Sequence, residues 1–82
     1  MTARVTVRYF AGARAAAGVA EESMTASTLS ELRSAMVRAH GEPLAPVLES
    51  ASFLVDGVSV RDPATTLADG ATVDVLPPFA GG

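Results

Sequence analysis

The sequence contains no cysteine, no lysine and only one histidine among its 82 residues. Without cysteine the chain has no disulfide and no thiol nucleophile, and one histidine is too few for an ordinary transition-metal site. Its six cations are all arginine and are scattered along the chain, and the formal net charge is −3. Nucleic acid and anionic membrane are therefore not expected as main partners, and we expect partner proteins instead.

Long apolar runs are also missing, because no stretch approaches the roughly 20 apolar residues that cross a bilayer. Met1 to Arg4 leads directly into an alternating pattern and not into the apolar segment of a signal peptide. Together with the absence of cysteine, this predicts a cytoplasmic protein. The chain is 49% hydrophobic and 18% charged, which suits a single compact domain of modest stability.

The first half of the chain predicts two strands followed by a helix. Apolar and polar residues alternate from Arg4 to Phe10, and a weaker strand pattern runs from Val19 to Ser27, with a loop containing a helical turn between them. A capping-box pattern begins at Thr28 and predicts a helix that ends before Gly41. The helix residues expected to face the sheet are Leu29, Leu32, Met36 and Ala39.

The second half predicts a short helical turn, a hairpin and a final strand. Residues 42–49 hold two prolines and three apolar residues, Leu44, Val47 and Leu48, that are expected to pack under the sheet. The Asp56-Gly57 dipeptide suits a type I′ hairpin turn between 53–55 and 58–60. Val73 and Val75 alternate with polar neighbours and indicate the final strand. This order predicts the α+β class, with a mixed sheet of about five strands, one main helix across one face, and the final strand parallel to the first.

The chain after the final strand is expected to be a tail. Pro77 and Pro78 stop the strand, and Gly-Gly at the end has no stability advantage. Six extended residues reach about 20 Å, enough to enter a channel in a partner. We therefore predict a domain over residues 1–76 and a flexible tail over 77–82. The residues predicted to thread into the partner are Pro77, Pro78, Phe79, Ala80 and Gly81.

Two large apolar residues are predicted to lie on the polar face of the sheet. By strand parity, Phe10 and Leu76 share the face opposite Val5, Val7, Val73 and Val75. Apolar side chains on a polar face near the start of the tail suggest a partner interface. The alternative is that they cover one edge of the core. His40, in the last helical turn, is interpreted as a solvated residue near the negative end of the helix dipole.

Two segments resemble a known family. Tyr9-Phe10-Ala11 followed by Arg14 and Gly18 is similar to a first-strand signature, and Leu67-Ala-Asp-Gly70 followed by Pro77-Pro78-Phe79-Ala80-Gly81-Gly82 is similar to a C-terminal one. On these residues the chain resembles the MoaD/ThiS type of ubiquitin-like β-grasp sulfur carriers, and within that type the small subunits of molybdopterin synthase (MoaD). The resemblance extends from Val5 to Gly82.

The resemblance implies that Gly82 is the reacting residue. A partner enzyme of the ubiquitin-activating type (MoeB/ThiF-like) would adenylate Gly82 with ATP, and a sulfur donor protein would convert it to a thiocarboxylate. A large subunit (MoaE-like) would then accept the tail. The chain itself would bind no cofactor, and Phe10, Arg14 and Leu76 would belong to the partner interface. Adenylation is chemically required because a free α-carboxylate, with a pKa of about 3.3–3.7, is an anion and a poor electrophile at neutral pH.

Two alternatives stay open. One is a sulfur carrier for thiamine (thiazole) or cysteine biosynthesis. The other is a ubiquitin-like modifier whose terminal glycine is conjugated to lysines of target proteins. Because the chain has no lysine, it cannot extend a chain of modifiers through its own side chains.

Overall fold

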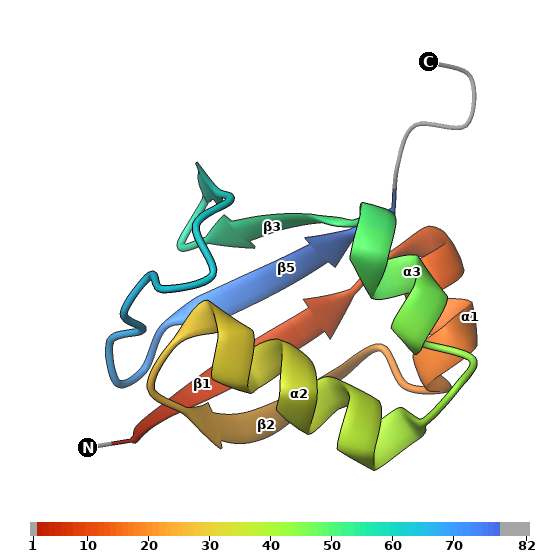
Figure 1. Cartoon of the computed structure of the whole chain (residues 1–82), viewed down its shortest axis with the longest axis horizontal. Coiled ribbons are helices and arrows are strands. Elements are labelled where there is room, and N and C mark those ends of the chain that lie inside the picture. The colour runs from red at the N-terminus through yellow and green to blue at the C-terminus, as the bar shows by residue number, and fades with distance from the viewer. Residues whose placement is uncertain (1, 78–82) are drawn as a thin grey trace.

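The computed structural model describes residues 2–77, which form a five-stranded mixed sheet and three helices (Figure 1). The sheet has the order β2-β1-β5-β3-β4, in which β1 and β5 are parallel and the other neighbours are antiparallel. The predicted fold class, and the central final strand beside the first, are confirmed. Along the chain the elements are β1 (Ala3–Tyr9), α1 (Ala11–Ala17), β2 (Glu21–Ala26), α2 (Leu29–His40), α3 (Ala45–Ser50), β3 (Ser52–Val55), β4 (Val58–Val60) and β5 (Thr72–Leu76).

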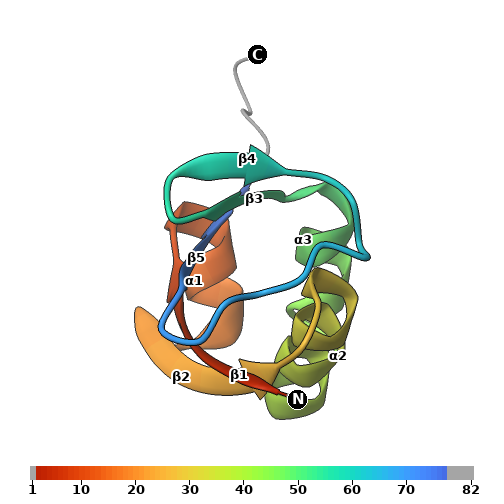
Figure 2. The same ribbon diagram turned by 90° about the vertical axis from the view of Figure 1, so that its left-hand side faces the viewer.

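The helices lie on one side of the sheet. Helix α2 crosses β1 and β2, while α1 and α3 lie side by side at the end toward which β1 and β5 run (Figure 1). The sheet curls around them, and α2 and α3 lie along one side of the curl (Figure 2). The core fills the space between these layers. Its central residues, all at most 1% exposed, come from the two parallel strands as predicted: Val5, Val7, Val73 and Val75.

Residues 11–17 form a helix of two turns, where the sequence predicted a loop with a helical turn. The prediction gave too much weight to the flanking glycines. Five of the seven residues are alanine, which has the highest helix propensity, and two of them, Ala13 and Ala17, are buried in the core. Gly18 ends the helix with φ 81°, and its N–H donates to the Arg14 carbonyl at 2.9 Å. The helix places Arg14 in a defined position on the surface.

Helix α2 starts and packs largely as predicted. Thr28 is its N-cap, with Oγ1 accepting from the Glu31 N–H at 3.2 Å. The Glu31 carboxylate, however, accepts from the Ser27 N–H at 3.0 Å and not from that of Thr28. Leu29, Leu32 and Met36 are buried, but Ala39 is exposed, so the expectation for Ala39 was wrong. The next inward position after Met36 is one full turn on, at His40.

The hairpin and the short third helix also agree with the sequence. Asp56 (φ 49°) and Gly57 (φ 84°) both have positive φ, as a type I′ turn requires. The turn is fixed to the neighbouring strand, because the Thr72 N–H donates to Asp56 Oδ1 at 2.9 Å. Leu44 and Leu48, before and within α3, are at most 2% exposed. Leu67 is buried at 4% exposure, as expected for a residue that fills the core from a loop.

His40 takes part in a network with the buried Tyr9, so its interpretation as a solvated residue was wrong. The Tyr9 hydroxyl donates to Glu22 Oε2 at 2.8 Å, and His40 Nε2 is hydrogen-bonded to the same oxygen. The two rings pack edge to face, with centroids 5.7 Å apart. The three side chains join β1, β2 and the end of α2, and this gives His40 a structural role.

The network predicts how stability changes at alkaline pH. Burial, and then the hydrogen bond and negative charge of Glu22, raise the pKa of Tyr9 above its ordinary value. The fold thus favours the neutral phenol, and this contribution is complete below the unfolded pKa of about 10 and is lost as the pH rises above it. We expect the free energy of unfolding to fall above pH 10 by up to about 1.4 kcal/mol per pH unit.

Because Tyr9 is the only tyrosine in the sequence, its ionisation can be followed separately by absorbance. Phenolate absorbance should increase only as circular dichroism reports unfolding, and Tyr9→Phe should lose this part of the pH dependence. Ionisation of Tyr9 near pH 10 in a protein that remains folded would contradict the role of burial.

Candidate functional site

The start of the predicted tail is fixed by the central strand of the sheet. β5 lies between β1 and β3, and its last residue, Leu76, pairs with Ser52. Leu76 and Pro77 are both half-buried. The predicted tail residues Pro78, Phe79, Ala80 and Gly81, and the predicted reacting residue Gly82, lie outside the described residues. The chain therefore leaves the sheet at the end where the parallel strands β1 and β5 have their C-termini.

Phe10 lies beside this exit. It follows β1 directly, keeps an extended backbone, and donates its N–H to the Val75 carbonyl at 3.1 Å. Its side chain is 38% exposed, and the Arg8 guanidinium lies 5.7 Å from its ring centroid. Arg8 and Phe10 therefore occupy the same face. Since Arg8 is in register with Asp74, and Leu76 follows Asp74 by two residues, Leu76 shares that face too, as parity predicted.

An ion pair that the sequence analysis did not identify occupies the centre of this face. Arg8 donates from Nε to Asp74 Oδ1 at 2.6 Å and from Nη2 to Oδ2 at 3.0 Å, so the contact is bidentate. The hydrogen bond and charge of Asp74 raise the pKa of Arg8. Asp74 is 8% exposed although it lies on the face away from the helices. The pair joins β1 to β5 in the middle of the face and leaves Phe10 and Leu76 as its apolar residues near the exit.

The sequence contained part of the information needed to predict the Arg8–Asp74 pair. Arg8 and Asp74 have opposite charges and the same strand parity on two strands that the sequence predicted to be parallel neighbours. Parity alone leaves the register open by steps of two residues, so it did not say which charged residues are opposite each other. The observed register, Thr6 with Thr72 and Tyr9 with Val75, decides it.

Arg14, the third predicted interface residue, does not lie on the sheet face that holds Arg8, Phe10 and Leu76. It sits on α1, one turn after Phe10, with its N–H directed to the Phe10 carbonyl at 3.4 Å. Its side chain is exposed and lines a shallow pocket with Gly18, Val19 and Ala20. The structure thus brings Phe10 and Leu76 to one face and places Arg14 on the adjoining surface of α1.

The described residues hold no group of side chains suited to ligate a metal ion. Among residues 2–77, no three His, Asp or Glu side chains lie close enough together to hold a metal ion. Within the same range, none of the helices has the length and apolar character needed to span a membrane. The candidate site therefore consists of the sheet end formed by β1 and β5 and the face that holds Phe10, Leu76 and the Arg8–Asp74 pair. The chain leaves β5 beside this face.

Comparison with known proteins agrees with this arrangement. The ThiS family model matches residues 7–82. No curated protein matches the sequence significantly. Among solved structures, small archaeal modifier protein 1 (SAMP1) from Methanosarcina acetivorans aligns with a TM-score of 0.88 at 23% identity, over 100% of this chain and 99% of that one, a likeness of fold.

Two further structures are described as molybdopterin converting factor. Subunit 1 from Pyrococcus furiosus aligns with a TM-score of 0.78 and 25% identity, covering 94% of this chain and 99% of that one. A chain from the complex of subunits 1 and 2 from Helicobacter pylori 26695 has a TM-score of 0.73 and 28% identity, covering 96% and 99%. The fold and the family match, which includes the Gly-Gly end, identify the chain as a member of the ThiS family of ubiquitin-like MoaD/ThiS-type sulfur carriers.

Proposed function

We propose that this protein delivers sulfur as a C-terminal thiocarboxylate and is the small subunit of a molybdopterin synthase. The observation that supports this most is the family match over residues 7–82, which reaches through the Pro-Pro-Phe-Ala-Gly-Gly end. Likeness to a chain from the complex of subunits 1 and 2 of molybdopterin converting factor, and to subunit 1 from Pyrococcus furiosus, supports the choice of pathway.

In the proposed reaction the protein is a carrier and its partners supply the catalytic groups. A carboxylate oxygen of Gly82 attacks the α-phosphate of ATP on an activating enzyme, and pyrophosphate leaves. The resulting mixed anhydride is an electrophile. A persulfide of a donor protein attacks its carbonyl carbon and displaces AMP, and a thiol of a partner protein then cleaves the acyl disulfide, which forms a disulfide with the donor and leaves the thiocarboxylate. Because the chain has no cysteine, it cannot supply this sulfur from a thiol of its own.

The described residues would serve this reaction by positioning the tail. The central strand β5 fixes the start of the tail, and Phe10 and Leu76 form an apolar contact beside it. A partner that covers this face would receive the tail in a defined direction.

The pathway is tested by the acceptor that takes the sulfur. Thiocarboxylated protein should form molybdopterin when mixed with a MoaE-like large subunit and the sulfur-free precursor. The matched comparison supplies a thiazole synthase and its substrates under the same conditions. If sulfur is transferred in the mixture with the large subunit and not in the mixture with thiazole synthase, the proposal is supported. Sulfur transfer only in the mixture with thiazole synthase would assign the protein to the thiamine pathway instead.

A further inference from the structure

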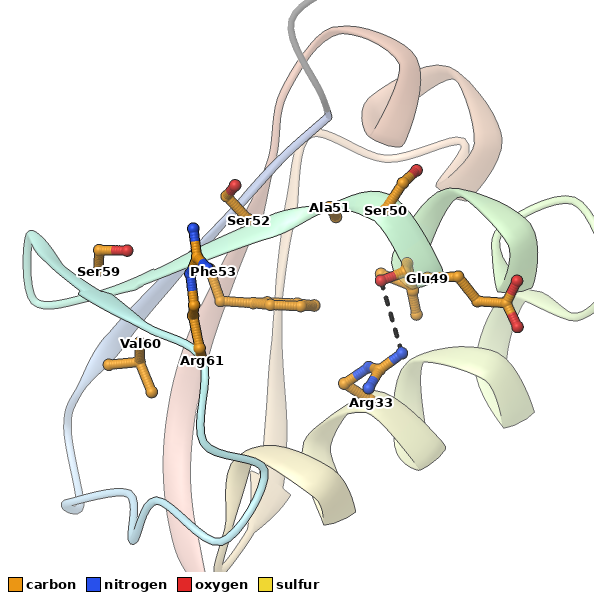
Figure 3. A pocket seen from close by; sticks show the side chains of 10 residues that line it. Arg33, Glu49, Ser50, Ala51, Ser52, Phe53, Ser59, Val60 and Arg61 are labelled. Carbon is orange, nitrogen blue, oxygen red and sulfur yellow. Dashed lines mark hydrogen bonds between the residues drawn. The ribbon is translucent and has the colours of Figure 1, made fainter.

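A pocket of about 340 Å³ lies between the β3–β4 hairpin and helices α2 and α3. Figure 3 shows Arg33 of α2 and Arg61, just after β4, on opposite walls of this pocket. Its lining does not include Phe10 or Leu76, although one lining residue, Ser52, pairs with Leu76. The remaining lining residues are Leu48, Glu49, Ser50, Ala51, Ser52, Phe53, Ser59 and Val60.

Arg33 has a buried donor without a partner. Its Nη2 donates to the Leu48 carbonyl at 3.5 Å, and its guanidinium lies 5.9 Å from the Phe53 ring centroid. Its Nε is buried and has no hydrogen-bond acceptor, and it is the one such side-chain atom in residues 2–77. A buried charged donor left unpaired is costly, so it calls for a bound water or ligand that accepts from it.

The rest of the pocket offers more donors than acceptors. Arg61 is exposed and forms no salt bridge within residues 2–77, and neither does Arg33. Three serines are among the lining residues, at positions 50, 52 and 59, and the strand register turns the side chains of Ser52 and Ser59 to the face that holds Leu76. Glu49 is the one acidic lining residue, and Figure 3 shows its carboxylate directed away from both arginines. In a chain with net charge −3, this is a locally positive pocket.

We propose that this pocket binds a phosphate group. Guanidinium groups match phosphate oxygens with paired N–H donors, and neither arginine has a carboxylate partner within residues 2–77. Pockets for small molecules start at about 300 Å³, which leaves room here for the organic part of a phosphate monoester. Arg33 would donate from the wall of α2 and Arg61 from the opposite side.

The test is a titration of the isotope-labelled full chain followed by amide NMR shifts. Inorganic phosphate and glycerol phosphate are compared with acetate at the same ionic strength. We expect shifts with phosphate confined to residues 48–53 and 59–61, and weaker or no shifts there with acetate. Tighter binding of glycerol phosphate than of inorganic phosphate would assign a monoester, and equal binding would assign free phosphate.

Variants identify the donors. Arg61→Gln should weaken phosphate binding about tenfold or more, since a hydrogen bond to a charged group contributes that much. Arg61 is exposed, so this variant should remain folded, and Arg33→Gln should have the same effect if it folds. Arg38→Gln is the matched control, because Arg38 is an exposed residue of the same helix outside the pocket. Equal binding by Arg61→Gln and the parent, or acetate binding as strong as phosphate binding, would overturn the proposal.

Discussion

A protein with Gly81 replaced by alanine is expected to transfer sulfur about 5- to 150-fold more slowly than the parent while keeping the parent's melting temperature. If the tail passes through a channel shaped for bare backbone, the added methyl meets partner atoms already in contact. Overpacking of this kind costs about 1–3 kcal/mol. The core of the described chain lies between Ala3 and Val75, so folding should not respond.

The assay is sulfur transfer with the activating enzyme and the large subunit present. Ala80→Ser is the matched control, because it adds one atom to a neighbouring residue that already has a Cβ. Transfer by Gly81→Ala at the parental rate would mean that no tight channel surrounds Gly81, and that the glycines serve flexibility at most.

Truncating Leu76 to alanine is expected to weaken binding of the large subunit by about 2 kcal/mol or more, which is roughly 30-fold. Leu76 is half-buried at the end of β5, so part of its surface is free to contact a partner. Phe10, on the same face and 38% exposed, should behave alike on truncation. Both variants should lose little stability compared with changes in the fully buried positions of the core.

The control for this face is Val58→Ala. Val58 is the most exposed large hydrophobic residue of the described chain, at 64%, but it lies on β4 at the hairpin, away from the tail exit. The Val58→Ala protein should bind the large subunit with the same affinity as the parent protein. A Leu76→Ala protein that melts early but binds at full affinity once folded would show that Leu76 belongs to the core edge.

The fold followed from the sequence because its local signals agree with one another. The alternation at Val5, Val7, Val73 and Val75 matches residues that are at most 1% exposed, and Asp56-Gly57 has the turn geometry that its residue types favour. The helix start at Thr28 was also correct. Each of these signals is short in range, and each depends on backbone preference or on one buried face.

Other features depended on tertiary contacts. In α1, Ala13 and Ala17 pack against the core, and this packing stabilises the helix. The high helix propensity of alanine and the nearby glycines pointed in opposite directions, so the sequence alone did not decide between a helix and a loop. His40 occupies the inward position one turn after Met36, but a polar residue there was assigned to solvent because its partner, Glu22, lies on another element. The buried Nε of Arg33 depends on the spacing of α2 from β3, which no local pattern contains.

Intact-mass spectrometry can show whether Gly82 receives the sulfur. The protein is incubated with a cognate activating enzyme, ATP and a sulfur donor, beside a variant that lacks Gly82. We expect the parent mass to change by the exchange of one oxygen for one sulfur, and the variant mass to stay unchanged. Sulfur incorporation by the variant, or a parent left unmodified by its cognate activating enzyme, would contradict the assignment of Gly82 as the reacting residue.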